Sequence, residues 1–209
     1  MLFEQIQVGR MGNYAYLVGT QTAGEALVVD PGFDSEKILN AAKKHELKIR
    51  YIILTHHHYD HVDTAMSLKS VTGAEILAHE ETERLLKGKV KIDRNLSDGE
   101  SFMLEASDAE IKVLHTPGHA PGSICLVIDN KWLITGDTLF IGTCGRTDLP
   151  GGNSRVLFES MQKIKALPDH LIVMSGHDYG SVSKRSLGEE KKLNPVLISS
   201  DFEAFDILP

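Results

Sequence analysis

The chain has 209 residues, of which 42% are hydrophobic and 24% are charged, and its formal net charge is −7. This is the composition of an ordinary soluble globular protein, and we expect a single domain over residues 1–209. The acidic balance without a basic cluster argues against a nucleic-acid partner, and no apolar run approaches the length of a membrane span. Two cysteines in different contexts and an N-terminus without a signal-peptide pattern favour a cytoplasmic location.

Apolar periodicity and turn residues divide the chain into two successive groups of strands and helices. In the first group we expect strands at residues 3–8, 13–19, 25–30, 51–54 and 75–79, and helices at 35–45, 62–71 and 80–87. A charged, exposed connection is expected at 87–94. In the second group we expect strands at 102–104, 110–115, 123–128, 131–135 and 171–175, and helices at 155–167 and 185–193.

This order predicts the fold class and two local features. Ser35 is placed to cap the helix that it begins, and Asp129 and Asn130 form a hairpin turn. Two half-domains, each a mixed sheet with helices on its outer face, give an α/β fold of four layers, an αββα sandwich. A three-layer α/β sheet fits the same order of elements.

Five potential metal ligands follow directly after the apolar strand expected at 51–54: His56, His57, His58, Asp60 and His61. In an extended segment alternate side chains share a side, so His56 and His58 can bind one metal ion while His57 points away and packs or faces solvent. Asp60 and His61 lie where the helix begins and can face a second ion. Nitrogen and oxygen ligands without thiolate suit zinc or iron.

Three further strands also end in metal-binding residues. His119 follows a Pro-Gly turn after the strand expected at 110–115, Asp137 follows the strand at 131–135, and His177 follows the strand at 171–175. The two oxygens of the Asp137 carboxylate can each bind one ion. Several strand ends carrying His or Asp at one sheet edge are what an open catalytic metal site needs.

Three other polar residues at strand ends receive different interpretations. We expect His79 and His115 to be structural, because each lies within or at the end of an apolar strand. Asp30, at the end of the strand expected at 25–30, either caps a neighbouring element or supports the metal site from behind.

The pattern His56-x-His58-x-Asp60-His61, followed by His119, Asp137 and His177, resembles the metallo-β-lactamase superfamily, and the match runs from Asn13 to about Pro195. The resemblance implies the αββα sandwich. It also implies that one metal ion is held by His56, His58 and His119 and a second by Asp60, His61 and His177. Asp137 would then bridge the two ions, with a catalytic hydroxide between them that Asp60 orients.

Within this superfamily the chain is most similar to the glyoxalase II-like group. β-Lactamase members usually carry a cysteine where this chain has Asp137, flavodiiron members usually carry a glutamate where it has His58, and nuclease members carry long extra domains. Residues 137–140 and 144–152 resemble both compact glyoxalase II-like hydrolases and persulfide dioxygenases, whereas residues 177–180, 188–190 and 194–195 lean toward the dioxygenases. The glutathione-binding helical domain of full-size glyoxalase II is expected to be missing.

Two reactions on one ligand set are therefore implied by the resemblance. We expect hydrolysis of a small thioester, an S-acyl thiol such as hydroxyacylglutathione, at two divalent ions, Zn or Fe or both. The alternative is oxidation of glutathione persulfide, or a similar small persulfide, at a single Fe(II) held by His56, His119 and Asp137. A scaffold whose metal only stabilises the fold is disfavoured, because structural zinc sites are closed and rich in cysteine.

Three residues are candidates for contact with this small thiol-derived substrate. The planar guanidinium of Arg146 suits an anionic group, although a salt bridge with Asp148 accounts for it equally well. Cys144 is a candidate contact for the substrate sulfur or simply a small loop residue. Tyr179, two residues after His177, either lines the pocket or packs in the fold. The sequence leaves a homodimer open.

Overall fold

The first sheet is formed by the N-terminal half of the chain. Its strands are β1 (Leu2–Val8), β2 (Asn13–Thr20), β3 (Glu25–Val29), β4 (Lys48–Leu54), β5 (Glu75–His79) and β6 (Arg94–Leu96), in that spatial order. The first two pairs are antiparallel, and β3 to β6 run parallel to one another. The structure, a computed structural model, describes residues 1–20, 24–104 and 109–208.

The second sheet is formed by the C-terminal half of the chain. Its spatial order is β14 (Arg185–Ser186), β13 (Ile172–Ser175), β10 (Trp132–Gly136), β9 (Ile124–Ile128), β8 (Glu110–His115) and β7 (Ser101–Met103). The pair of β10 and β13 is parallel, and its other pairs are antiparallel. After β10, the short strands β11 (Leu139–Phe140) and β12 (Thr143–Cys144) form a separate hairpin.

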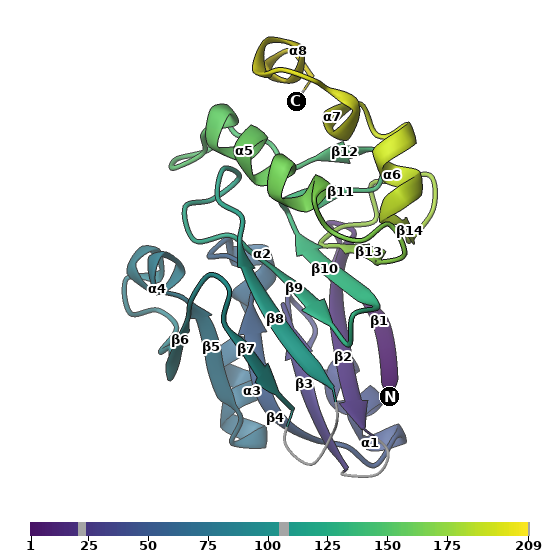
Figure 1. The fold of residues 1–209 in the computed structure, drawn as a ribbon. Helices are drawn as coiled ribbons and strands as arrows, with labels where there is room; N and C mark the ends of the chain where they lie inside the picture. Colours follow the sequence, from purple (N-terminus) through teal and green to yellow (C-terminus); the bar gives the residue numbers. More distant parts are fainter. Residues whose placement is uncertain (21–23, 105–108, 209) are drawn as a thin grey trace.

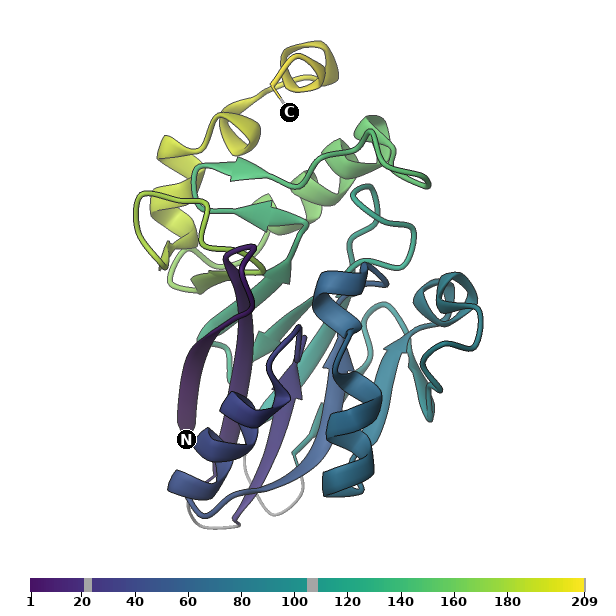
Figure 2. The ribbon, with the colours of Figure 1, turned by 180° about the vertical axis from the view of Figure 1, so that it is seen from behind.

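Helices cover the outer faces of both sheets (Figure 1). α1 (Ser35–Lys44) and α3 (Ala65–Thr72) lie across the first sheet, as the view from behind shows (Figure 2). α5 (Ser154–Lys165) packs on the second sheet, with α7 (Pro195–Ile198) and α8 (Phe202–Asp206) beside it and α6 (Leu187–Leu193) following β14. The short helices α2 (Tyr59–Val62) and α4 (Glu80–Leu86) follow β4 and β5.

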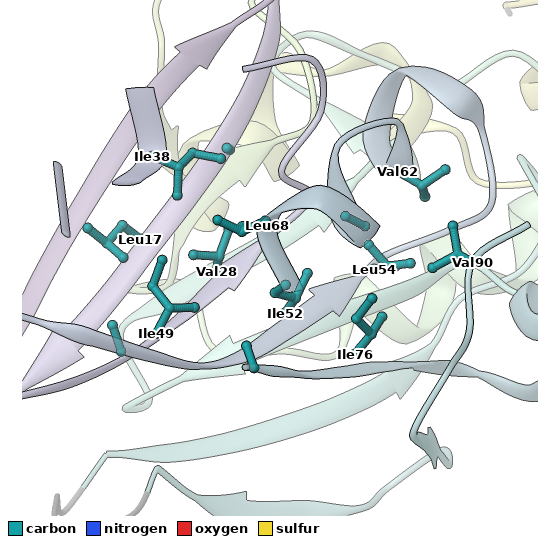
Figure 3. Packing of buried hydrophobic residues seen from close by; sticks show 14 of the residues in the cluster. Leu17, Val28, Ile38, Ile49, Ile52, Leu54, Val62, Leu68, Ile76 and Val90 are labelled. Carbon is teal, nitrogen blue, oxygen red and sulfur yellow. The ribbon is translucent and has the colours of Figure 1, made fainter. Parts of the chain in front are cut away.

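The core has three layers, because successive side chains of a strand point to opposite faces. In β4, Ile52 and Leu54 pack outward against Leu68 of α3 (Figure 3), whereas Ile53 points inward. The inner layer joins the two sheets through residues such as Leu27, Ile53, Ile111 and Ile134. A third layer lies between the second sheet and α5. The αββα sandwich is therefore confirmed, and the three-layer alternative is wrong.

Several local predictions need correction. Asp34, not Ser35, caps α1, since its side chain accepts a hydrogen bond from the backbone N–H of Lys37. The helix expected at 62–71 is two helices, α2 and α3, and α2 already contains Asp60 and His61. The connection at 87–94 is not uniformly exposed, because Val90 and Ile92 are buried. Strand β6, the β11–β12 hairpin and helices α7 and α8 were not expected.

Other local predictions are confirmed. Asp129 and Asn130 form the hairpin turn between β9 and β10, with φ of 53° and 46°, as a turn of this type requires. The helix expected at 185–193 begins at Leu187, after a two-residue strand that pairs with β13. Among the residues that the structure describes, no helix is long and apolar enough to cross a membrane.

Candidate metal centre

All seven residues predicted as metal ligands converge at one end of the sandwich, on loops and a short helix that follow β4, β8, β10 and β13. The ligand atoms of His56, His58 and His119 lie within 4.8 Å of one another and form what we call the histidine cluster. Those of Asp60, His61 and His177 also lie within 4.8 Å of one another and form the mixed cluster.

Asp137 lies between the two clusters. Its Oδ2 atom is 3.6 Å from Nε2 of His119 in the histidine cluster and 3.2 Å from Nε2 of His177 in the mixed cluster. The carboxylate follows the end of β10, which pairs in parallel with the strand that leads to His177. One short side chain therefore reaches both clusters from the floor of the site.

Hydrogen bonds behind the mixed cluster fix which nitrogen of each imidazole faces inward. Nδ1 of His177 donates to the backbone carbonyl of Met11 at 3.0 Å, and Nδ1 of His61 donates to the carboxylate of Asp30 at 3.0 Å. In the neutral rings both Nε2 atoms then carry lone pairs, yet these two atoms are 3.1 Å apart. Two facing lone pairs need a proton or a cation between them.

The histidine cluster is oriented in the same way. Nδ1 of His119 donates to the carbonyl of Arg146 at 2.7 Å. The hydroxyl of Thr55 donates to Asp30 at 2.6 Å, so Nδ1 of His56 must donate to that hydroxyl at 3.0 Å. Nε2 of His56 is then a bare acceptor, and it is buried without a hydrogen-bond partner among the described residues.

Oδ1 of Asp137 is also buried and makes no hydrogen bond to any described residue. Unsatisfied buried acceptors are costly in a folded protein, unless something outside the chain satisfies them. Imidazole nitrogens and carboxylate oxygens are preferred ligands of zinc and of iron. The arrangement of the residues therefore fits a pair of divalent metal ions.

The electrostatics differ between the clusters. Burial lowers the pKa of His56 well below its ordinary value, lowers that of His58 to about 4, and lowers that of His119. Burial also acts to lower the pKa of His61 and of His177, but the nearby Asp137 carboxylate outweighs it and raises the pKa of both. The histidine cluster is therefore neutral near pH 7, whereas a proton is held in the mixed cluster without metal.

Asp137 itself is ionised. Burial would raise the pKa of its carboxyl group, but the neighbouring His61 and His177 hold that pKa well below its usual range. A buried anion surrounded by imidazoles is a strong attractor for cations. This charge pattern agrees with the geometric fit to a metal pair.

A family model of the metallo-beta-lactamase superfamily matches residues 8–177, which include all seven predicted ligands. The chain belongs to the metallo-β-lactamase superfamily. The fold, with its two facing sheets and outer helices, agrees with this membership.

Relatives in the superfamily include enzymes named hydroxyacylglutathione hydrolase. The hydroxyacylglutathione hydrolase GloC of Haemophilus influenzae is 35% identical over 190 residues, which cover 83% of this chain and 88% of that protein. A hydroxyacylglutathione hydrolase of Rhodospirillum rubrum is 37% identical over 168 residues, which cover 80% of this chain but 62% of that longer protein.

Three solved structures that carry different names are similar to this chain over most of its length. ETHE1 from Myxococcus xanthus has a TM-score of 0.87 and 28% identity, covering 98% of this chain and 88% of that chain. The B3 metallo-beta-lactamase BLEG-1 has a TM-score of 0.82 and 30% identity over 95% and 100% of the two chains. TTHA1623, solved in a di-iron-bound form, has a TM-score of 0.77 and 30% identity over 92% and 98%.

Two residues that support this superfamily site were missed in the sequence. Nδ2 of Asn13 donates to Oδ2 of Asp60 at 2.9 Å and to its backbone carbonyl at 3.2 Å, and Asn13 is buried. Met11 supplies the carbonyl that holds His177. Both lie at the β1–β2 turn, whose Gly12 carbonyl accepts from the N–H of Asp178 at 2.7 Å. The only available signal was a polar Asn beginning an otherwise apolar strand.

Other sequence interpretations have clear outcomes. Asp30 supports the site from behind, and it does not cap a helix. His79 and His115 stack on each other with ring centroids 3.9 Å apart and belong to neither cluster, so their structural interpretation is confirmed. His57 belongs to neither cluster either, but it is half-buried and lines the cavity in front of the site.

A cavity of about 610 Å³ opens in front of the clusters and is lined by all three candidate substrate contacts, Arg146, Cys144 and Tyr179. Arg146 also forms the salt bridge with Asp148, through Nε and Nη2 at 2.5 Å each. Cys144 is buried in β12, where burial raises the pKa of its thiol to about 12. Tyr179 stacks on the ring of His177 with centroids 4.5 Å apart.

Proposed function

We propose that this protein hydrolyses a small thioester at a binuclear metal centre. The observation that supports this most is the presence of two complete clusters, each with three ligand atoms within 4.8 Å, on either side of the Asp137 carboxylate. A binuclear centre uses all the residues of both clusters, whereas a single Fe(II) held by His56, His119 and Asp137 uses only part of them. The similarity to hydroxyacylglutathione hydrolases over most of the chain supports the same reaction class.

The clusters would hold the two ions, with His56, His58 and His119 on one and Asp60, His61 and His177 on the other. Ions bound there would lower the pKa of a coordinated water molecule and would polarise the thioester carbonyl. Asp60 lines the cavity, and Asn13 donates to its Oδ2 atom at 2.9 Å, so the carboxylate oxygen that does not hold the ion would accept the proton of the attacking water. The hydrogen bonds from Nδ1 of His61, His119 and His177 keep those rings in place while the substrate reacts.

Oxidation of a small persulfide remains the alternative, since it needs only His56, His119 and Asp137 around one Fe(II). The variant His177→Ala separates the two reactions, because it removes a ligand of the mixed cluster alone. We expect this variant to lose thioester hydrolysis by at least about 100-fold and one metal ion per chain. Persulfide oxidation would survive it. The exposed His170, which belongs to neither cluster, provides the control His170→Ala.

The decisive experiment measures metal content and turnover on the same purified protein. We expect close to two Zn or Fe per chain, release of thiol from hydroxyacylglutathione or from a neutral S-acyl thiol, and no oxygen uptake. One Fe per chain with oxygen uptake on glutathione persulfide would overturn the proposal. Hydrolysis of a β-lactam faster than any thioester would also overturn it, and that substrate is included because of the similarity to BLEG-1.

A further inference from the structure

Outside the two clusters, the lining of the cavity offers little positive charge to a substrate. Among the described residues that line it, Arg146 is the only Lys or Arg, and two nitrogens of its guanidinium group are engaged by Asp148 at 2.5 Å. Burial raises the pKa of the Cys144 thiol to about 12, so this thiol carries no charge near pH 7. A substrate that carries several carboxylates therefore finds no unengaged Lys or Arg among these lining residues.

The mouth of the same cavity is formed by large apolar side chains. Met11, Tyr59 and Tyr179 line the cavity and are 42%, 62% and 55% exposed, which is unusual for such residues. Clustered exposed apolar side chains beside a pocket are typical of ligand-binding surfaces. Phe140, Leu149 and Pro150 extend this apolar wall, and of these Phe140 is buried whereas Pro150 is exposed.

These exposed side chains are held in place. The hydroxyl of Tyr59 contacts the sulfur of Met11 at 3.3 Å, and its ring meets Phe33 edge-on with centroids 5.8 Å apart. Tyr179 stacks on His177 and meets Phe140 edge-on with centroids 5.4 Å apart. Because these contacts favour the rotamers that line the cavity, less conformational entropy is lost when an apolar group covers these residues.

We propose that this cavity selects thioesters of apolar, uncharged thiols over thioesters of glutathione. The proposal rests on the proposed function for the reaction and adds the class of substrate. Glutathione brings two carboxylates and an ammonium group, and their desolvation against an apolar wall has no compensating partner. An uncharged thiol such as N-acetylcysteamine gains contact with Met11, Tyr59 and Tyr179 without that cost.

Binding of two unreactive thioethers tests the selection without any turnover. S-benzylglutathione and S-benzyl-N-acetylcysteamine carry the same ring on a charged and on an uncharged thiol. For the metal-loaded protein we expect the uncharged compound to bind at least about tenfold more tightly by calorimetry. Equal or tighter binding of S-benzylglutathione would overturn the inference.

Substitutions test whether the residues named above determine the preference for the uncharged compound. Tyr59→Ala and Met11→Ala should each weaken binding of the uncharged compound about three- to tenfold, whereas Met66→Ala, of similar exposure to Met11 but outside the cavity, should not. Asp148→Asn frees Arg146 and should strengthen binding of S-benzylglutathione alone. If both compounds respond alike to Asp148→Asn, charge does not govern the selection, and the inference is wrong.

The two proposals fail separately. Loss of thioester turnover with the expected binding preference would refute hydrolysis and leave the apolar selectivity of the cavity standing. Turnover of glutathione thioesters at a higher kcat/KM than that of N-acetylcysteamine thioesters with the same acyl group would refute the selectivity and leave hydrolysis standing.

Discussion

Oδ2 of Asp30 accepts a hydrogen bond from Nδ1 of His61 at 3.0 Å, and both residues are buried beneath the cavity. The same oxygen accepts the hydroxyl proton of Thr55, whose oxygen in turn receives Nδ1–H of His56. One carboxylate therefore fixes the tautomer of an imidazole in each cluster. Its own backbone has φ of 49°, a left-handed conformation that Asp tolerates better than most residues.

The variant Asp30→Asn should weaken metal binding at both clusters. Asp30 accepts through both carboxylate oxygens, from the N–H and hydroxyl of Thr55 and from Nδ1 of His61. The amide of Asn has one acceptor oxygen and one donor group, so at least one of these hydrogen bonds is lost. We expect metal affinity to fall about 10- to 100-fold, measured by competition with a chelator. Asp34→Asn is the control, because Asn also caps α1 and Asp34 lies outside the site. Unchanged affinity in Asp30→Asn would contradict this role.

The two clusters should lose metal at different pH values. A metal ion must displace the proton held by His61 and His177, whose pKa values are raised, but displaces none from the neutral His56, His58 and His119. Lowering the pH should therefore release the ion of the mixed cluster first. The ion of the histidine cluster should stay bound until the pH approaches the pKa of His58, about 4. Metal content after dialysis at stepwise lower pH measures this. Simultaneous release of both ions would argue against separate clusters.

In the metal-free protein, the two clusters should change the free energy of unfolding in opposite directions as the pH falls. The raised pKa of His61 contributes stability that is fully present below the unfolded pKa of 6.5 and is lost as pH rises through the folded value. The pKa of His58 is lowered to about 4, so the unfolded chain binds a proton more readily than the folded one between pH 6.5 and 4. The folded state therefore loses stability as the pH falls through this range. Denaturant midpoints of His58→Gln should therefore fall less on acidification than those of the parent protein.

Gly176→Ala should disable the site while the protein stays folded. A Cβ atom at Gly176 would clash with Oδ1 of Asp137 and would press on the backbone of Gly136 at the end of β10, so the carboxylate between the clusters must move. We expect loss of most bound metal and of turnover. Gly73→Ala is the control, since a Cβ there meets nothing within 4 Å and its φ of 71° leaves only a backbone cost of about 1 kcal/mol. Full metal content in Gly176→Ala would refute the argument.

Asn13→Ala should reduce kcat more than it changes KM. The variant removes the hydrogen bond from Nδ2 to Oδ2 of Asp60, so the proton acceptor loses its orientation while the histidine cluster is untouched. We expect kcat to fall about 10- to 100-fold. Steady-state kinetics with parallel metal analysis measures the effect, with the exposed Asn40→Ala as control. A change confined to KM would assign Asn13 to substrate binding instead.

Glu190→Gln should destabilise the wall of the cavity. The fully buried Glu190 accepts hydrogen bonds from the N–H of Gly142 and from Asn194 at 2.9 Å and from Arg185 at 2.8 Å, and thereby holds the β11–β12 hairpin. Neutralising one partner of a buried ion pair costs about 3 kcal/mol or more, measurable by urea unfolding. Glu189→Gln, in the exposed capping box of α6, should lose less. Equal losses would contradict this assignment.

The convergence of the seven candidate ligands could be predicted from sequence because these residues are concentrated in short segments at strand ends. His, His, Asp and His within six positions after an apolar strand rarely occur together outside a metal site. The order of strands and helices suggested the αββα fold, and the resemblance favoured it over a three-layer sheet. The positions of Asp60 and His61 in their own short helix could not be predicted, because the break at Asp63 and Thr64 has no Gly or Pro to mark it.

The supporting residues were harder to predict because their roles depend on distant contacts. Met11 acts through a backbone carbonyl, which any residue provides, and Asn13 acts on a residue 47 positions away. Val90 and Ile92 are two apolar residues among lysines, and only the packing beneath α3 and β5 decides that they are buried. Patterns within a segment do not carry such information.

Four of the candidate ligands follow β4, a strand of the first sheet. The other three, His119, Asp137 and His177, follow strands of the second sheet. Metal ions bound there cross-link the two halves of the sandwich, so the free energy of binding also opposes their separation. Depletion of metal should then shorten the lifetime of the protein against proteases as well as stop turnover. Metal supply would in this way govern how much of the protein persists, independently of how much is synthesised.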